Sequence, residues 1–289
     1  RGLGDVYKRQ EEDTLIAVLP FYHIYGMTVI LNSALSHGAT VVCMSRFDLE
    51  QFLVLMQKHE VTRAHLVPPI VLALAKHPMV EGYAFPKLKT IMSGAAPLGP
   101  ELAEDCARRL GCTVKQGYGL TETSPVTHLN PEPPGRVVPG SIGICIPNTE
   151  CRIVDYETGR DLGTGMQGEL WIRGPQVMKG YLNNEEATNQ TIDPEGWLKT
   201  GDIAEVDEEG YFKIVDRVKE LIKYKGFQVA PAELEALLLT HPSIADCAVV
   251  PAEDPEAGEI PVGFVVYKEN MVENPETIME FISQKVSPQ

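Results

Sequence analysis

The segment QGYGLTETSP gathers side chains suited to a phosphorylated ligand. Gly117 and Gly119 let the backbone approach a ligand closely, and Tyr118 between them offers a flat face to a base. The Thr121 hydroxyl can bond a phosphate oxygen, and the Glu122 carboxylate can hold Mg²⁺, a hard cation that prefers oxygen ligands. A plain turn followed by a helix cap fits the same residues, so spacing alone leaves both interpretations open.

Two further groups of polar residues could bind a ligand. Asp202 is expected to end a strand in a Gly-Asp turn, where its carboxylate could accept two hydrogen bonds from ribose hydroxyls; an ordinary turn aspartate is the alternative. Lys223, Lys225 and Gln228 fall within KYKGFQ, a basic run in an acidic chain. Such a run favours binding of an anion, and a solvated basic turn is the alternative.

The composition limits the classes of protein that need to be considered. The chain has 289 residues, with 25 Lys and Arg against 40 Asp and Glu, which gives a formal charge of −15. This acidic balance argues against non-specific binding to nucleic acid or to an anionic membrane. The longest apolar run, HLVPPIVLALA, is short and holds two prolines, so no membrane span is expected.

Six cysteines are scattered along the chain and form no C-x-x-C pair: Cys43, Cys106, Cys112, Cys145, Cys151 and Cys247. This spacing indicates neither a zinc site nor a disulfide framework, and reduced thiols in a cytoplasmic protein are expected. The opening RGLGDVYKRQ lacks the apolar stretch of a signal peptide and joins abruptly to the next segment. Residues 1–10 are therefore interpreted as a non-native leader.

Apolar runs alternate with amphipathic runs in the first half of the chain. Strands are expected at 14–20, 39–44, 62–68, 88–94 and 113–119, and helices at 24–35, 48–60, 68–77 and 99–110. Asp48 suits an N-cap, Gly38 ends the first helix, and Phe52, Leu55 and Met56 mark one apolar face. This alternation with short connections predicts an α/β fold with a largely parallel sheet.

The pattern changes after Pro125. The segment 128–143 is rich in proline and glycine and is expected to be irregular. Short strands follow at 149–155, 168–174, 197–207 and 211–217, and they predict a β-rich subdomain.

A smaller α+β unit is expected from Val218 onward. Its helix at 231–241 would bury Leu234, Leu237 and Leu238, followed by strands at 246–254 and 260–268 and a last helix near 275–286. We place a domain boundary at Asp216–Arg217, between a partial large domain, 11–216, and a truncated small domain, 217–289.

Five motifs resemble those of the adenylate-forming, or AMP-binding, superfamily, in the order that the superfamily has them. They are LPFYHIYG (19–26), SGAAPLG (93–99), GYGLTE (117–122), WLKTGD (197–202) and VDRVKELIKYKGFQVAPAELE (215–235). The resemblance runs from about residue 11 to the last residue, and five motifs in register make coincidence negligible. Within the superfamily the motifs are most similar to those of 4-coumarate:CoA ligases and acyl-CoA synthetases.

The resemblance implies a large domain made of a parallel α/β sheet and a β-rich subdomain, followed by a small α+β domain. It implies an ATP-dependent ligase that joins a small carboxylic acid to coenzyme A, with Mg²⁺ bound. Attack of the carboxylate on the α-phosphate would give an acyl-adenylate, and the thiol of coenzyme A would then displace AMP. A cytoplasmic or peroxisomal location is expected for such an enzyme.

The resemblance also assigns roles to individual residues. The catalytic residues would be His23, Thr121, Glu122, Lys223 and Gln228, with Glu122 as the metal ligand. Contacts to the nucleotide or to coenzyme A would come from Ser93, Gly94, Ala95, Gln116, Gly117, Tyr118, Gly119, Thr121, Asp202, Arg217, Lys225 and Gly226. The acyl pocket would include Tyr25, Val29, Met92, Ala95, Gly119, Pro125, Val126 and Thr127.

Several of these assignments have a purely structural alternative. His23 is expected in an aromatic cluster with Phe21, Tyr22 and Tyr25, near the reacting carboxylate. The alternative is a core histidine whose ring nitrogens are hydrogen-bonded within the protein. Arg217 would hold the nucleotide beside the hinge, and the alternative is a surface ion pair. The small residues of SGAA would form a thin wall between adenine and the acyl group, but they also suit tight packing. In similar ligases the small domain rotates between the two half-reactions, which would bring KYKGFQ to the thiol.

The chain also departs from the superfamily pattern. A Ser/Thr/Gly-rich phosphate loop and a lysine that contacts the α-phosphate are not found in it, so we expect these 289 residues alone not to catalyse adenylation. GELWIRG replaces the GEICIRG of plant members, and Val29 and Thr127 replace residues common in relatives. A hydroxycinnamate or a medium-chain fatty acid would fit the expected apolar pocket.

Three other interpretations stay open. Beetle luciferase carries similar motifs, QGYGLTET among them, and a peptide-synthetase adenylation domain is a more distant possibility. A nucleotide-binding pseudoenzyme belongs to a different class, and the intact Thr121, Glu122, Asp202 and Arg217 argue against it.

Overall fold

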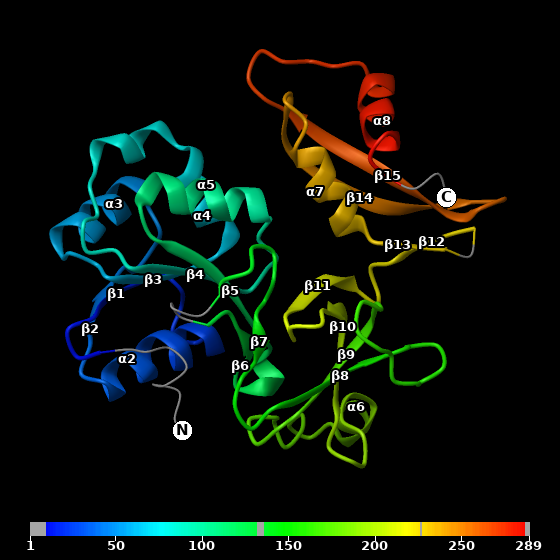
Figure 1. The fold of residues 1–289 in the computed structure, drawn as a ribbon, viewed down its shortest axis with the longest axis horizontal. Helices are drawn as coiled ribbons and strands as arrows, with labels where there is room; N and C mark the ends of the chain where they lie inside the picture. Colours follow the sequence, from blue (N-terminus) through cyan, green and yellow to red (C-terminus); the bar gives the residue numbers. More distant parts are fainter. Residues whose placement is uncertain (1–9, 132–135, 226, 287–289) are drawn as a thin grey trace.

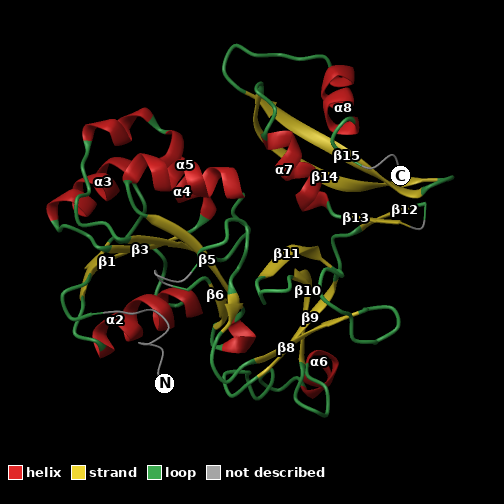
Figure 2. Cartoon of the chain, in the orientation of Figure 1, coloured by secondary structure: helices red, strands yellow, loops and turns green. Residues whose placement is uncertain are grey.

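The computed structural model describes residues 10–131, 136–225 and 227–286, which form three sheets (Figure 1 and Figure 2). The first sheet has seven strands in the order β2-β1-β3-β4-β5-β6-β7. Its parallel part consists of β1 (Thr14–Ala17), β2 (Thr40–Cys43), β3 (Arg63–Leu66), β4 (Thr90–Ser93) and β5 (Thr113–Gly119). All five strands and the parallel sheet were predicted from the sequence.

Helices cover both faces of this sheet. They are η1 (Tyr25–Asn32), α2 (Ser33–Ser36), α3 (Leu49–Lys58), α4 (Pro68–Lys76), the short 3-10 helix η2 (Pro78–Gly82) and α5 (Pro100–Leu110). Figure 1 shows α3, α4 and α5 on one side and α2 on the other. Because side chains alternate along a strand, Ile16 of β1 packs under α3, α4 and α5, whereas Leu15 and Ala17 pack against η1 and α2.

The predicted helices are confirmed in place. Asp48 caps α3, since its carboxylate accepts a hydrogen bond from the Gln51 N–H at 2.8 Å. Phe52 and Met56 are buried on the predicted face, while Leu55 is half-buried. The helix expected at 24–35 begins as π-helix η1 and becomes α-helical only in α2; π turns are rare and often lie at functional sites.

Two antiparallel strands, β6 (Val126–Leu129) and β7 (Ile144–Cys145), complete the first sheet. The prediction of an irregular segment over 128–143 is wrong at its start, because His128 and Leu129 pair with Tyr118 and Gly117 of β5. The prolines and glycines of that segment come after the strand, so the composition of the whole segment gave no sign that its first two residues are in a strand. The residues at 132–135 lie outside the described part of the chain.

The second sheet is antiparallel, with the order β11-β10-β9-β8. Its strands are β8 (Glu150–Val154), β9 (Gly168–Arg173), β10 (Leu198–Val206) and β11 (Phe212–Arg217), and they form the predicted β-rich subdomain. Helix α6 (Glu185–Thr191) lies beside it and was not predicted, because it has no buried residue and therefore no apolar periodicity.

Asp202 does not end a strand in a turn, as the sequence suggested. Strand β10 runs through it to Val206, and its pairing with β9 shifts register between Lys199 and Ile203. Gly201, with φ of +73°, makes this irregularity possible because glycine adopts positive φ without steric cost. The Gly-Asp pair therefore marks a bulge within a strand.

The small third unit has a four-stranded antiparallel sheet in the order β13-β12-β15-β14. Its elements are β12 (Ile222–Tyr224), β13 (Phe227–Val229), α7 (Pro231–Leu239), β14 (Ile244–Asp254), β15 (Gly258–Tyr267) and α8 (Pro275–Ser283). The α+β class is confirmed. In α7 only Leu238 of the three predicted leucines is fully buried, and Leu234 and Leu237 are half-buried. Across the described residues, the helices are too short or too polar to cross a membrane.

One buried carboxylate joins the second sheet to the small unit. Asp216, near the end of β11, accepts a hydrogen bond through Oδ2 from the N–H of Ala232 in the first turn of α7, at 3.0 Å. Its Oδ1 accepts from the N–H of Arg217 at 2.7 Å. A carboxylate at a helix N-terminus is favourable because it satisfies a free N–H and faces the positive end of the helix dipole.

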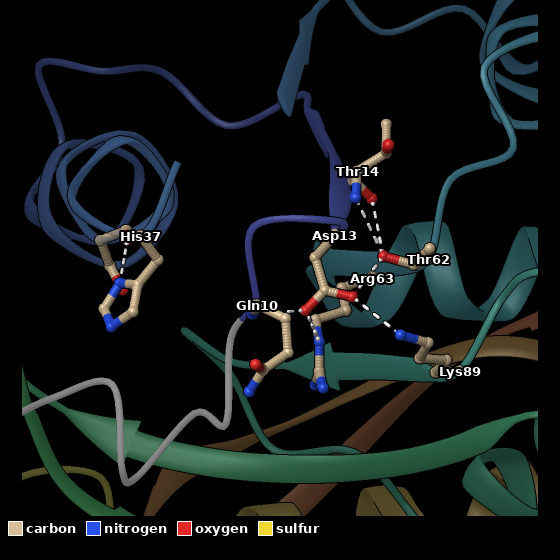
Figure 3. A network of polar contacts seen from close by, with 8 residues as sticks. Gln10, Asp13, Thr14, His37, Thr62, Arg63 and Lys89 are labelled. Atoms are coloured by element: carbon tan, nitrogen blue, oxygen red, sulfur yellow. Dashed lines mark hydrogen bonds and ion pairs between the residues drawn. The ribbon is translucent and has the colours of Figure 1, made fainter. Parts of the chain in front are cut away.

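A second buried carboxylate ties the start of β1 to the neighbouring strands (Figure 3). Asp13 is fully buried and accepts hydrogen bonds from Thr62 at 2.9 Å, Arg63 at 2.8 Å and Lys89 at 3.1 Å. The N–H of Gln10 donates to it as well, at 3.1 Å. Burial acts to raise the pKa of Asp13, but the hydrogen bonds from Thr62 and Arg63 and the charge of Arg63 outweigh it and hold the pKa below its usual value.

Replacing this carboxylate should destabilise the fold. We expect Asp13→Ala to lower the free energy of unfolding by about 3 kcal/mol, because it removes the shared acceptor of the Thr62, Arg63 and Lys89 hydrogen bonds from a largely buried ion pair. Since the folded pKa of Asp13 is lowered, its contribution is present above the unfolded pKa and is lost as pH falls through the folded pKa. Urea unfolding at neutral and acid pH measures both effects.

The exposed ion pair of Asp105 with Lys76 provides the control. Asp105→Ala should cost less than about 1 kcal/mol at neutral pH. An equal loss in the two variants would contradict the prediction, because the Asp13 network would then contribute no more than an exposed ion pair.

Candidate active site

The candidate site is built around the turn between β5 and β6. Gly119 pairs with Val126, and the backbones pass so closely that a Cβ on Gly119 would lie 2.0 Å from the Pro125 carbonyl oxygen. The short 3-10 helix η3 (Thr121–Thr123) closes the turn, held by the Thr123 hydroxyl, which accepts from the Leu120 N–H and lies within hydrogen-bond distance of the Leu120 and Pro125 carbonyls. The motif thus uses Thr123 to fix its own backbone and leaves Thr121 exposed.

Tyr118 and Asp202 come together from different sheets. The Tyr118 hydroxyl donates a 2.5 Å hydrogen bond to Asp202 Oδ2, which joins β5 of the first sheet to β10 of the second. Behind Tyr118, the buried ring of His128 lies 5.9 Å away and edge-on, and it packs in turn on Phe212 at 4.5 Å. Burial lowers the pKa of His128 to about 3, so this ring is neutral and serves as part of an apolar wall.

The two members of this pair have shifted pKa values for the same reason. Burial is the main cause that raises the pKa of Tyr118, and the charge of Asp202 adds to it. Burial also raises the pKa of Asp202, against the lowering effects of the Tyr118 hydrogen bond and the Arg217 charge. A buried carboxylate whose charge is disfavoured by its surroundings is a common feature of ligand-binding sites.

Arg217 lies at the open side of Asp202. Its Nε is 3.6 Å from Asp202 Oδ1, and its Nη1 is 3.5 Å from Glu220. Two thirds of the Arg217 side chain is exposed, at 67%, against 13% for Asp202. The ion pair given as the alternative for Arg217 therefore exists, and it stands beside the candidate nucleotide group.

Glu122 is half-buried at the η3 turn. Its Oε1 accepts a 2.8 Å hydrogen bond from the hydroxyl of Tyr181, and its carbonyl accepts one from the N–H of Met178 at 2.7 Å. The exposed hydroxyl of Thr121 is its neighbour in sequence. An oriented carboxylate next to a free hydroxyl offers the hard oxygen ligands that Mg²⁺ prefers.

An apolar cavity of about 160 Å³ opens on the side of the turn that carries Val126, and such cavities are where small molecules bind. Its lining residues are Thr28, Val29, Ser124, Pro125, Val126, Ile146 and Gln176. Three of the predicted pocket residues are among them. Tyr25 and Met92 pack in the same hydrophobic cluster as Val29 and Val126, so they support this wall. Thr127 is turned elsewhere: its hydroxyl lies 3.4 Å from the Tyr118 carbonyl oxygen.

The end of β4 forms the opposite border of the turn. Ser93 is fully buried, and Gly94 packs so closely on the Tyr25 ring that a Cβ would lie 3.0 Å from it. Ala95 is exposed with φ of +70°, a conformation that is strained for a residue with a Cβ and that is often found at functional sites. The predicted ligand residue Gln116 instead clamps Leu98, with hydrogen bonds of 2.9 and 3.1 Å to its N–H and carbonyl.

The aromatic cluster predicted around His23 is wrong. Phe21 packs in the cluster under η1, Tyr25 packs beside the cavity, and Tyr22 is 92% exposed. His23 is itself exposed, and its Nδ1 accepts a hydrogen bond from the Tyr25 N–H at 3.1 Å. These residues form a turn leading into η1, so neighbouring side chains point in different directions. The core histidine given as the alternative is wrong as well.

The residues on either side of Gly226 in the basic run KYKGFQ belong to two paired strands, so the solvated turn given as the alternative does not describe Lys223 and Gln228. Lys223 pairs with Gln228 across β12 and β13, a pairing that strands of three residues do not reveal in sequence. Gln228 lies 3.4 Å from Glu157, and the Lys225 ammonium lies over the Tyr224 ring. Figure 1 shows the hairpin well away from β4, β5 and β6. Gly226 lies outside the described residues.

Sequence reasoning missed several residues of this region. Thr28, Ser124, Ile146 and Gln176 line the cavity, and Tyr181 holds Glu122. Thr28 and Ser124 adjoin predicted pocket residues, so sequence proximity could have suggested them. The other three come from irregular segments whose return to the site depends on tertiary structure.

The fold is that of an α/β protein, and its candidate site lies at the carboxyl edge of the parallel strands. The AMP-binding enzyme family matches residues 2–182, a range that includes most of the predicted leader, and the AMP-binding enzyme C-terminal domain matches residues 233–289. The chain belongs to the AMP-binding enzyme family.

Individual relatives agree with this assignment. The chain is 51% identical over 286 residues to the 4-coumarate-CoA ligase 2 of Narcissus pseudonarcissus, covering 98% of this chain and 50% of that protein. The chain therefore spans about half the length of the curated relatives it matches.

Solved structures match the whole arrangement of the chain. ATP-bound MatB from Rhodopseudomonas palustris has a TM-score of 0.91 at 29% identity, over 99% of this chain and 56% of that one, whereas apo MatB gives 0.78 over the same shares. The o-succinylbenzoate CoA synthetase MenE from Bacillus subtilis, in complex with its acyl-adenylate, gives 0.83 at 29% identity, over 97% of this chain and 56% of that one.

The close passage of Gly119 should tolerate no side chain. We expect Gly119→Ala to lower the free energy of unfolding by at least about 1–3 kcal/mol, because the added Cβ overlaps backbone atoms that have little freedom to move. Chemical unfolding measures the change. The matched control is Gly82→Ala, whose Cβ would meet nothing within 4 Å and whose effect should stay within about 0.5 kcal/mol.

Neutralising Asp202 should stabilise the fold. Because burial raises its folded pKa, the group favours the folded state below its unfolded pKa and loses that contribution as pH rises through the folded pKa. Asp202→Asn should therefore have a higher melting temperature than the natural chain at neutral pH, and the difference should shrink in acid. A clear loss of stability at neutral pH would contradict this, and Asp161→Asn, at an exposed carboxylate, is the control.

Proposed function

We propose that the protein containing this chain is an ATP-dependent carboxylic acid:CoA ligase. One observation carries the proposal: a single turn, from β5 to β6, separates a polar tyrosine–aspartate pair from an apolar cavity. Tyr118 faces Asp202 on one side, while Pro125 and Val126 line the cavity on the other. A reaction that joins a nucleotide to an apolar acid needs two such compartments that share one wall.

The polar side suits the nucleoside part of ATP. The ring of Tyr118 can stack on a base, and Asp202 Oδ1 and Oδ2 can accept hydrogen bonds from the two ribose hydroxyls. Arg217 stands beside that carboxylate and can bind a phosphate oxygen. The Tyr118–Asp202 and Arg217–Asp202 contacts hold these side chains in place without a nucleotide. Hydrogen bonds to the ribose would replace part of these contacts on binding.

The turn itself suits phosphates and a metal ion. Thr121 can donate to a phosphate oxygen, and Glu122, held by Tyr181, can bind Mg²⁺. When bound, Mg²⁺ would offset the negative charge that develops on the phosphate oxygens. The carboxylate oxygen of the acid forms a bond to the α-phosphorus, pyrophosphate leaves, and the thiol of coenzyme A later takes the acyl group from AMP.

The cavity suits a small, largely apolar acid. Its volume of about 160 Å³ is below the roughly 300–1,000 Å³ of pockets for drug-sized ligands. A cavity of this volume favours a small hydroxycinnamate-like acid over a long fatty chain. The identity to a 4-coumarate-CoA ligase supports the same substrate class.

The orientation of the small unit supports a further step of the proposal. The higher TM-score to ATP-bound than to apo MatB indicates an arrangement like that of the nucleotide-bound state. In this arrangement the β12–β13 hairpin, which carries Lys223, Lys225 and Gln228, lies well away from β5 (Figure 1). Their proposed role therefore belongs to the thiol-transfer step, after the small unit has rotated. His23 is exposed and lies two residues before η1. Its proposed place is beside the reacting carboxylate of the acid.

The six free cysteines support a reducing compartment. The proposed location is the cytoplasm, with the peroxisome as the alternative.

The test is acid-dependent release of pyrophosphate by the full-length protein with ATP and Mg²⁺. The acids are 4-coumarate, caffeate, cinnamate and octanoate, each with and without coenzyme A. We expect the highest kcat/KM with a hydroxycinnamate and a CoA thioester as product. Asp202→Asn should lower kcat/KM by about tenfold or more, because a hydrogen bond to a charged group is worth about 1.5–3 kcal/mol. Asp161→Asn should leave it unchanged.

Preference for octanoate would overturn the substrate class and keep the reaction. No pyrophosphate release with any acid, from a folded protein, would overturn the ligase and support a nucleotide-binding protein without this chemistry.

A further inference from the structure

Three side chains with soft or nitrogen ligand atoms converge behind the candidate site. His128 comes from β6, Cys145 from β7 and Cys151 from β8, so they bring together the first and second sheets. One ligand atom from each lies within 4.8 Å of the others. The two sulfur atoms are 3.0 Å apart, and Cys151 Sγ is 3.4 Å from His128 Nε2.

Their spacing in sequence hides this group. The cysteines are separated by five residues, and the histidine lies 17 positions before the first cysteine, so no C-x-x-C or similar pattern appears. The β6–β7 ladder creates the proximity, because His128 and Cys145 are direct cross-strand partners. The connection through Asn148, with φ of +64°, then returns Cys151 to the same place.

The orientation of the histidine is fixed by its surroundings. The hydroxyl of Thr127 lies 3.4 Å from the Tyr118 carbonyl and 3.0 Å from His128 Nδ1. In the tautomer whose proton is on Nδ1 and is donated to the Thr127 oxygen, the lone pair of Nε2 faces Cys151. Metal-binding histidines are held in this way, with one ring nitrogen hydrogen-bonded and the other on the ion.

The distances are close to those of a tetrahedral site. Zn–S bonds are about 2.3 Å and Zn–N bonds about 2.0–2.1 Å, so two sulfurs on one ion lie about 3.8 Å apart. The sulfurs here need to separate by less than about 1 Å, within the reach of a side-chain rotation. Both cysteines are half-buried, which leaves room for a fourth ligand from water.

We propose that Cys145, Cys151 and His128 bind a divalent cation that prefers sulfur and nitrogen ligands, such as Zn²⁺. Each cysteine loses its S–H proton on binding, so uptake of one ion releases two protons to the solvent. The ion would link β6 and β7 to β8 and hold the His128 ring against Tyr118. The proposal does not depend on the ligase proposal, because metal binding at these side chains needs no nucleotide, acid or coenzyme A.

Cobalt(II) is the probe, because it binds in zinc sites with similar geometry and its complexes absorb visible light. The full chain, reduced and freed of metal, is titrated with Co²⁺ and then with Zn²⁺. We expect one Co²⁺ per chain, with thiolate-to-cobalt charge-transfer absorption and the intense d–d bands of tetrahedral geometry, all removed by one equivalent of Zn²⁺. Cys145→Ser and Cys151→Ser should each abolish the charge-transfer bands or reduce them by about half or more, since each removes one of two thiolates.

Controls separate this site from other thiols and from misfolding. Cys247→Ser, also at a half-buried cysteine, should leave the spectrum unchanged. Circular dichroism confirms that each serine variant is folded, and His128→Gln should weaken Co²⁺ binding by at least about tenfold, as expected for loss of a ligand. Absence of charge-transfer bands, or bands that survive both Cys145→Ser and Cys151→Ser, would overturn the proposal. The proposal would also be overturned if Cys145 and Cys151 were isolated as a disulfide and the reduced chain then bound no metal.

Discussion

The close contact between Gly119 and the Pro125 carbonyl is the constraint on which the site depends. It allows β5 to reverse into β6 within a few residues, so that one short segment supplies the Tyr118 ring, the η3 turn and one wall of the cavity. A side chain at position 119 would push the two strands apart and open the wall between the compartments. The Thr123 hydroxyl holds the turn from inside. Rigid elements place binding groups more accurately than loops do, and here a loop is made rigid by backbone packing.

The Tyr118–Asp202 pair holds a carboxylate in surroundings that disfavour its charge. Burial disfavours the charge of Asp202, and the fold keeps it because the carboxylate lies where two sheets meet and has a neighbouring arginine. Asp13 is also buried but has the opposite outcome, because hydrogen bonds from Thr62, Arg63 and the Gln10 N–H and the charge of Arg63 lower its pKa despite that burial. The donors and charges around a buried carboxylate, and not burial alone, therefore decide the direction in which its pKa shifts.

Much of this arrangement could be predicted from the sequence. The parallel strands and their helices follow from apolar periodicity, and the candidate nucleotide residues follow from motifs whose order is fixed along the chain. The failures have physical causes. Helix α6 has no buried face, the β12–β13 hairpin has strands of three residues, and Asp202 lies in a bulge that looks like a turn. The cavity residue Gln176 and the Cys145–Cys151 pair could not be predicted, because only tertiary structure brings them to their partners.

The hydrogen bond from the Ala232 N–H to Asp216 has a consequence for any rotation of the small unit. Asp216 lies on β11 and Ala232 lies in the first turn of α7, so a large rotation about this boundary separates the two groups. The helix then loses an anionic partner at its positive end, and both groups must find water or new partners. A rotated orientation of the small unit would therefore differ from the present one in the hydration of one helix terminus. Solutes that compete for water would shift the balance between them, even without touching the ligand site.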